Sequence, residues 1–194
     1  MKKAVQTLPE GYGEILSVDM EGDKKLAVII NGLALLIAAV MTVPMIFIVP
    51  ISSLLEDNQT EAQGVIKMLT LVVGMVLYLV LHEAVHGIAM KYYGCKKVRF
   101  GLKGPYAFAA TDDYLPRKPY VVVALAPIVV WGVVFAVMNL LVPTGWFWVV
   151  YILQICNISG AAGDLYISFR LRKLPDDILV QDSGVSMRVF SAKR

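Results

Sequence analysis

The chain has 194 residues, of which 58% are hydrophobic and 17% charged, and its mean hydropathy is +0.68. Soluble domains carry roughly 45–50% apolar residues, so this composition excludes an ordinary soluble domain and places the chain in a lipid bilayer. The two cysteines, Cys95 and Cys156, are too few for a disulfide framework, and we expect both to be packing residues.

Four stretches are long and apolar enough to cross a membrane, which takes about 20 residues at ~1.5 Å each. They are residues 26–50, 65–90, 119–142 and 146–169. The first is too long for the apolar core of a signal peptide and lacks a small-x-small cleavage site, so we expect it to be retained and the mature protein to be the whole chain. We predict an all-α membrane protein: a single integral membrane domain over 1–194 with four transmembrane helices and small cytoplasmic β-hairpin elements.

The basic residues predict the orientation in the membrane. Four of the 18 Lys and Arg residues precede the first span, seven lie in 91–118, six follow residue 169, and none lies in 51–64. By the positive-inside rule, the loop 91–118, the tail 170–194 and both termini are cytoplasmic in a multi-pass cell-membrane protein. Because orientation accounts for the charges, we expect the lipid bilayer as a partner and no nucleic acid; the sequence is silent on oligomeric state.

Two polar segments have the pattern of β-hairpins. In "KVRFGLKGPYAFAATDD" apolar and polar residues alternate over 98–103, and Gly104-Pro105 then predicts a turn into a second strand. The tail "DILVQDSGVSMRVF" repeats this pattern around a turn at 182–184. The alternative for the tail is a solvated segment that pairs with nothing else.

The stretch "LHEAVHG", residues 81–87, places polar groups in an otherwise apolar span. His82 and His86 are four residues apart, so they project from one helix face with Glu83 beside them. In such an HExxH pattern two imidazoles bind zinc and the carboxylate takes a proton from the attacking water. The alternative is that the cluster caps the cytoplasmic helix end, but the helix dipole there disfavours a glutamate.

A catalytic zinc takes three protein ligands, and the chain has no further histidine. Asp164 is the other acidic residue within the spans, and we expect it at a depth similar to that of His86. The small residues 159–163 would let its helix approach another closely. The alternative for Asp164 is a buried structural pair with a residue such as Arg170.

Two further residues of the spans are candidates for roles in the site. Asn157 lies seven residues before Asp164, on the same helix face, where it could donate a hydrogen bond to a developing oxyanion or simply bond a neighbouring helix. Pro127 is expected to kink the span 119–142, which would either open a water route to the metal or be tolerated packing.

The motif "LHEAVHG", the basic hairpin loop, "ALAP" and "NISGAAGD" together resemble the putative zincin peptidases, small membrane proteins known mostly from bacteria and related to the site-two proteases. The resemblance implies a bacterial source, His82, His86 and Asp164 as ligands, and Glu83 as the base. The chain departs from the related enzymes in three places: no proline follows Asn157, glycine precedes Asp164 instead of following it, and no asparagine follows Pro127 closely.

The sequence therefore predicts a membrane-embedded metallopeptidase that holds one Zn²⁺ and hydrolyses peptide bonds of membrane or membrane-proximal substrates near the cytoplasmic face. Glu83 and Asn157 are its predicted catalytic residues. Two alternatives stay open: a non-catalytic zinc-binding membrane adaptor or regulator, and a small transporter whose acids and histidines line a permeation path. The intact HExxH favours the enzyme over the adaptor, and the acids at one depth argue against the transporter.

Overall fold

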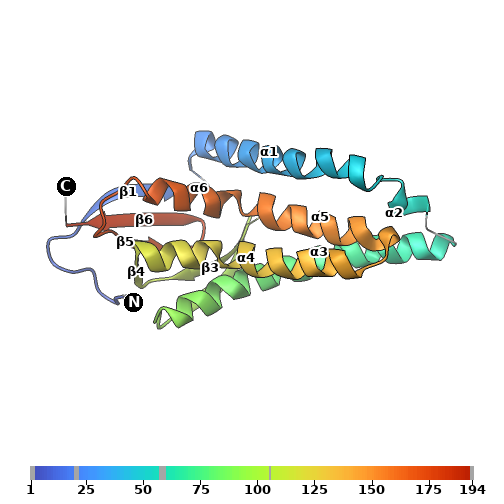
Figure 1. Ribbon diagram of the computed structural model, residues 1–194. Helices are drawn as coiled ribbons and strands as arrows, with labels where there is room; N and C mark the ends of the chain where they lie inside the picture. Colours follow the sequence, from blue (N-terminus) through green and yellow to red (C-terminus); the bar gives the residue numbers. More distant parts are fainter. Residues whose placement is uncertain (1–2, 20–21, 57–59, 105, 193–194) are drawn as a thin grey trace. The chain divides into compact units, whose positions relative to one another are not determined.

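The computed structural model describes residues 3–19, 22–56, 60–104 and 106–192 (Figure 1). The helices are α1 (Lys24–Ile48), α2 (Ser53–Glu56), α3 (Glu61–Tyr92), α4 (Arg117–Leu141), α5 (Thr144–Gly160) and α6 (Ala162–Leu171). The strands are β1 (Gly13–Asp19), β2 (Val98–Lys103), β3 (Tyr106–Thr111), β4 (Tyr114–Pro116), β5 (Leu179–Asp182) and β6 (Ser186–Ser191).

Four helical segments of the described chain are long and apolar enough to cross a membrane: Lys24–Ile48, Glu61–Tyr92, Arg117–Leu141 and Thr144–Leu171. The prediction of four such helices is confirmed. Large apolar side chains stand exposed along them, for example Leu35 at 73% and Val80 at 64%. Water would disfavour so many exposed apolar groups, whereas the hydrocarbon of a bilayer solvates them.

The fourth span is two helices rather than the one predicted over 146–169. Helix α5 ends at Gly160 and α6 begins at Ala162, while Ala161 between them has φ −85° and ψ 19°. Glycine has a low helix propensity, and Gly160 and Gly163 flank the break. As a result Asp164 lies in the first turn of α6, where the helix dipole favours a carboxylate.

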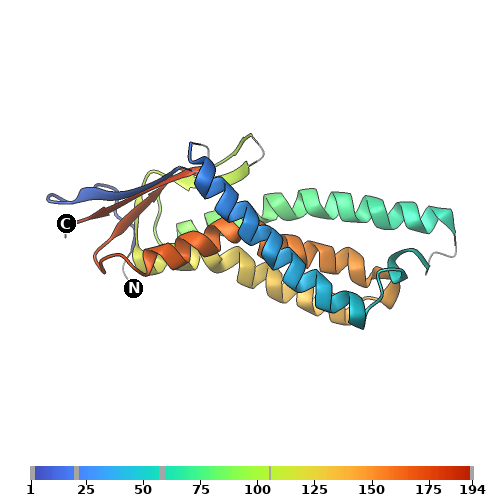
Figure 2. The ribbon, with the colours of Figure 1, turned by 90° about the horizontal axis from the view of Figure 1, so that it is seen from above.

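The β structure is more extensive than predicted. The two predicted pairs are present, β2 with β3 and β5 with β6, but the prediction of an all-α protein with only small hairpins is wrong. The six strands form a two-stranded sheet, β2-β3, and a four-stranded antiparallel sheet in the order β1-β6-β5-β4. The tail pairs with β1 on one side and β4 on the other, so the first and last strands lie side by side (Figures 1 and 2).

The larger sheet forms because β5 and β6 carry apolar side chains that need cover. Val180 and Val189 are fully buried, as is Leu115 of β4. A two-stranded hairpin alone is marginally stable, and pairing both of its edges satisfies the backbone groups that it would otherwise expose. The sequence did not indicate β1 because its residues lack a marked alternation, and it did not indicate β4 because that strand has only three residues.

The chain divides into two compact units. One comprises Met1–Ile30, Leu81–Pro127 and Gly163–Arg194, and the other comprises Asn31–Val80 and Ile128–Ala162. The first holds both sheets, and the core of the second includes Tyr78, Phe135, Val150 and Leu153. All three predicted metal ligands and Glu83 belong to the first unit. A single membrane domain over the whole chain stays a prediction.

Candidate metal centre

Helix α3 carries the HExxH residues of the site. It runs for 32 residues without an internal proline, so the spacing of four residues holds His82 and His86 on one face. Both histidines are 8% exposed, and their ring centroids lie 4.9 Å apart with planes at 75°. Buried ring nitrogens such as these need polar partners.

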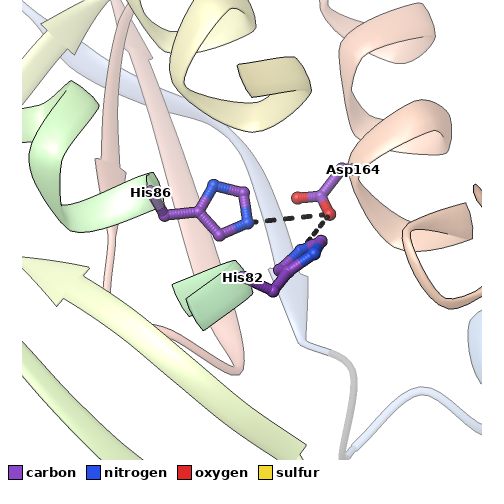
Figure 3. Close-up of side chains that lie close together, drawn as sticks. All are labelled: His82, His86 and Asp164. Atoms are coloured by element: carbon purple, nitrogen blue, oxygen red, sulfur yellow. Dashed lines mark ion pairs between the residues drawn. The ribbon is translucent and has the colours of Figure 1, made fainter. Parts of the chain in front are cut away.

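Asp164 from the first turn of α6 faces both imidazoles (Figure 3). Its Oδ2 lies 3.8 Å from the Nε2 atom of His82 and 3.8 Å from that of His86. One possible ligand atom from each of the three residues lies within 4.8 Å of the others. Arg170, the alternative partner considered for Asp164, donates to the Tyr166 hydroxyl at 3.1 Å.

The three side chains fit a zinc ion. Tetrahedral zinc with bonds of about 2.0–2.1 Å places its ligand atoms about 3.3 Å apart. The two distances to Asp164 exceed this by about half an ångström, which small side-chain rotations remove. Two imidazole nitrogens and a carboxylate oxygen also match the donor types of catalytic zinc sites, which hold the metal with three protein ligands.

A backbone carbonyl orients His86. Its Nδ1 atom lies 2.9 Å from the carbonyl oxygen of Val123 in α4, and the bond is buried. Because a carbonyl oxygen only accepts, Nδ1 must carry the hydrogen, and the lone pair of the neutral ring is then on Nε2, the atom nearest Asp164. This is the tautomer that a metal ligand bound through Nε2 needs.

Glu83 is half-buried beside the three ligands. Its carboxylate interacts with both imidazoles and with Asp164, and it accepts a hydrogen bond from the backbone amide of Ala109. Ala109 is in the middle of β3, so this strand runs past the carboxylate. A base next to the metal ligands and a strand edge beside it are the two features that hydrolysis of an extended peptide needs.

Two glycines let the β2–β3 hairpin pack closely against α3 and the tail. A Cβ atom on Gly87, the residue after His86, would lie 2.3 Å from Cζ of Phe100 in β2. At Gly184, whose φ is +98°, a Cβ would lie 2.4 Å from Cδ2 of Phe108 in β3. The aromatic rings therefore occupy the space that side chains at these positions would fill. The hairpin packs both on the metal-binding turn of α3 and on the turn of the tail.

Sequence reasoning missed a hydrogen-bonded pair that joins α4 to the tail, Tyr120 and Asp182. The Tyr120 hydroxyl donates to Oδ2 of Asp182 at 2.8 Å, and the Gly184 amide donates to Oδ1 at 2.8 Å. Burial raises the pKa of Asp182 to about 6, although both donors act in the opposite direction. No short-range motif marks these residues, because they are 62 positions apart.

Asn157 belongs to the second unit, where it is fully buried. Its amide donates to the Ile128 carbonyl at 3.2 Å, and its oxygen accepts from the Tyr78 hydroxyl at 3.2 Å. These bonds to α3 and α4 match the alternative in which Asn157 simply bonds neighbouring helices. The expectation that Asn157 and Asp164 share a helix face assumed one continuous helix, and the break at Ala161 interrupts that helix. A catalytic role for Asn157 stays a prediction.

The profile of a family described as "Putative zincin peptidase" matches residues 75–179, which is more than half of the chain and includes all three candidate ligands. The chain belongs to this family. The family's name implies zinc, and together with the four apolar helices it indicates a membrane-associated metallopeptidase.

A curated relative of Pyrococcus woesei, called "Uncharacterized 24.7 kDa protein in gap 5'region", is 30% identical over 128 residues. The alignment covers 61% of this chain and 53% of the relative, so the chain spans about half the length of the protein it matches. No solved structure matches the chain significantly.

Proposed function

We propose that this protein is a membrane-embedded zinc metallopeptidase that cleaves membrane or membrane-proximal polypeptides near the cytoplasmic face, and that it is related to the site-two proteases. The observation that carries the proposal is the position of Asp164. A carboxylate 82 residues away in sequence from His82 lies 3.8 Å from both imidazoles of an HExxH helix. Burying such a group in an apolar span is costly, and holding a metal accounts for it.

The proposed chemistry is hydrolysis with Glu83 as the general base. His82, His86 and Asp164 would hold the zinc ion, which would supply Lewis-acid polarisation of the scissile carbonyl and a lowered pKa of water. The Glu83 carboxylate takes a proton from the attacking water, whose oxygen bonds to the carbonyl carbon. The same carboxyl then gives the proton to the leaving nitrogen as the C–N bond breaks. The products are a carboxylate and an amine.

The β3 strand offers a means of holding the substrate. The Ala109 amide reaches Glu83, so the edge of β3 that carries this amide runs beside the base. A peptide must be extended before it is cleaved, and an extended segment pairs with a strand edge through backbone bonds. We therefore propose that unwound polypeptide adds to this edge. Backbone pairing alone would give little sequence selectivity.

Glu83→Gln tests the base. The substitution keeps the side-chain volume but cannot accept a proton, so cleavage of fluorescein-labelled casein by the detergent-solubilised protein should fall by about 10²–10⁴-fold while zinc content is kept. Glu61→Gln makes the same change in the exposed first turn of α3 and should leave cleavage unchanged.

The ligand variants separate the enzyme from the two alternatives. Replacing His82, His86 or Asp164 by Ala should reduce the zinc content, because a two-ligand site loses much of its affinity. A non-catalytic adaptor would retain its function in Glu83→Gln. A transporter would show altered metal flux in vesicles and no cleavage in any form. Full zinc binding by Asp164→Ala together with unchanged cleavage by Glu83→Gln would refute the proposal.

A further inference from the structure

Pro127 is fully buried inside α4, and the helix continues through it from Arg117 to Leu141. In an α-helix each carbonyl accepts from the amide four residues later, so the carbonyl of Val123 should accept from residue 127. Proline has no amide hydrogen. The Val123 carbonyl therefore lacks its ordinary partner in the helix.

That carbonyl is the one that His86 uses. The Nδ1 atom of His86 lies 2.9 Å from the Val123 oxygen, in a part of α4 where Val123 itself is 2% exposed. A buried carbonyl without a partner is destabilising, and the imidazole supplies the donor that Pro127 cannot. The proline and the histidine are thus linked through one oxygen atom.

We propose that Pro127 is a positioning residue of the metal centre: it keeps the Val123 carbonyl out of the helical hydrogen-bond ladder, so that this carbonyl fixes His86 as the Nδ1–H tautomer. The Nε2 lone pair then points to Asp164, as a ligand requires. The inference rests on the proposed metal site and is independent of peptide cleavage. A kink for a water route and simple packing are the alternatives for this proline.

A residue with an amide at position 127 would compete with His86 for the Val123 oxygen. Pro127→Ala and Pro127→Val both introduce such an amide, and the second fills more of the volume of the ring. Losing a hydrogen bond that orients a metal-binding histidine typically weakens metal binding by about 10–100-fold. Pro44 lies in α1 on an exposed face, so Pro44→Ala is a matched control that changes a helical proline away from the site.

Two measurements test the proposal. Zinc affinity, by competition with a chromogenic chelator, should fall by about 10–100-fold in both Pro127 variants and stay unchanged in Pro44→Ala. In metal-free protein at a pH of about 8.5, where imidazole is neutral, ¹⁵N spectra of labelled histidine should show His86 as the Nδ1–H form in the wild type. Both Pro127 variants should show a mixture of tautomers. The chain has two histidines, so His82→Ala assigns the signals.

The outcomes discriminate between positioning and packing. Unchanged tautomers in both variants would overturn the proposal. So would weaker zinc binding in Pro127→Ala with normal binding in Pro127→Val, because the lost volume would then be the cause. If the wild type bound no zinc, the proposed function would fail, while the tautomer measurement would still decide the role of Pro127.

Discussion

Replacing Gly87 by alanine is expected to release the β2–β3 hairpin from α3. The new Cβ would lie 2.3 Å from Cζ of Phe100 and 2.8 Å from its Cε1, against an ordinary contact of 3.4–4 Å. The ring must therefore retreat by at least about 1.1 Å, the difference between 2.3 and 3.4 Å. Since Phe100 is 58% exposed, it can swing outward, and the hairpin then loses its contact beside His86.

Two effects of opposite sign set the magnitude. Overpacking costs about 1–3 kcal/mol, whereas alanine in a helix interior is favoured over glycine by about 0.5–1 kcal/mol. We expect Gly87→Ala to destabilise the protein by about 0–2.5 kcal/mol. In a Phe100→Ala background the clash is absent, so the same change should stabilise by about 0.5–1 kcal/mol. The coupling energy of the double-mutant cycle should then be about 1–3 kcal/mol.

Denaturation of the detergent-solubilised protein measures the four stabilities, and hydrogen exchange over 98–111 reports on hairpin docking. Gly32→Ala in α1 is the matched control, because a Cβ there meets nothing within 4 Å and only the helix preference should appear. Equal effects of Gly87→Ala with and without Phe100 would refute the reasoning. Unchanged hairpin exchange in Gly87→Ala would refute it as well.

Two further predictions concern the tail and the topology. Burial raises the pKa of Asp182 from 3.8 to about 6, so the carboxyl of the unfolded chain ionises at a lower pH than that of the folded protein. The free energy of unfolding of the metal-free protein should therefore fall as the pH rises from 3.8 to about 6, by at most about 3 kcal/mol. Asp182→Asn should show a flatter dependence on pH in thermal denaturation; identical pH profiles would contradict the prediction. The charge asymmetry predicts that reporter fusions place residues 51–64 outside and 91–118 inside. A middle loop found outside would end the proposal of a cytoplasmic site.

The sequence by itself determined what depends on short-range pattern. The apolar runs predict four helices because a bilayer demands about 20 apolar residues in a row. The spacing of His82 and His86 predicts one helix face because the helical period is local. The alternation at 98–103 and the turn at Gly104 predict the hairpin for the same reason. None of these inferences needs contact between distant parts of the chain.

The tertiary structure decided which distant groups meet. It brings Asp164 of α6 to within 3.8 Å of both histidines, and it pairs β1 with β6 from opposite ends of the chain. Two groups of the site, the Val123 carbonyl and the Ala109 amide, belong to the backbone, which every residue carries. No side-chain pattern can mark them. Their roles follow only from how α4 and β3 pack against α3, because long-range packing selects which of many equivalent backbone groups faces the site.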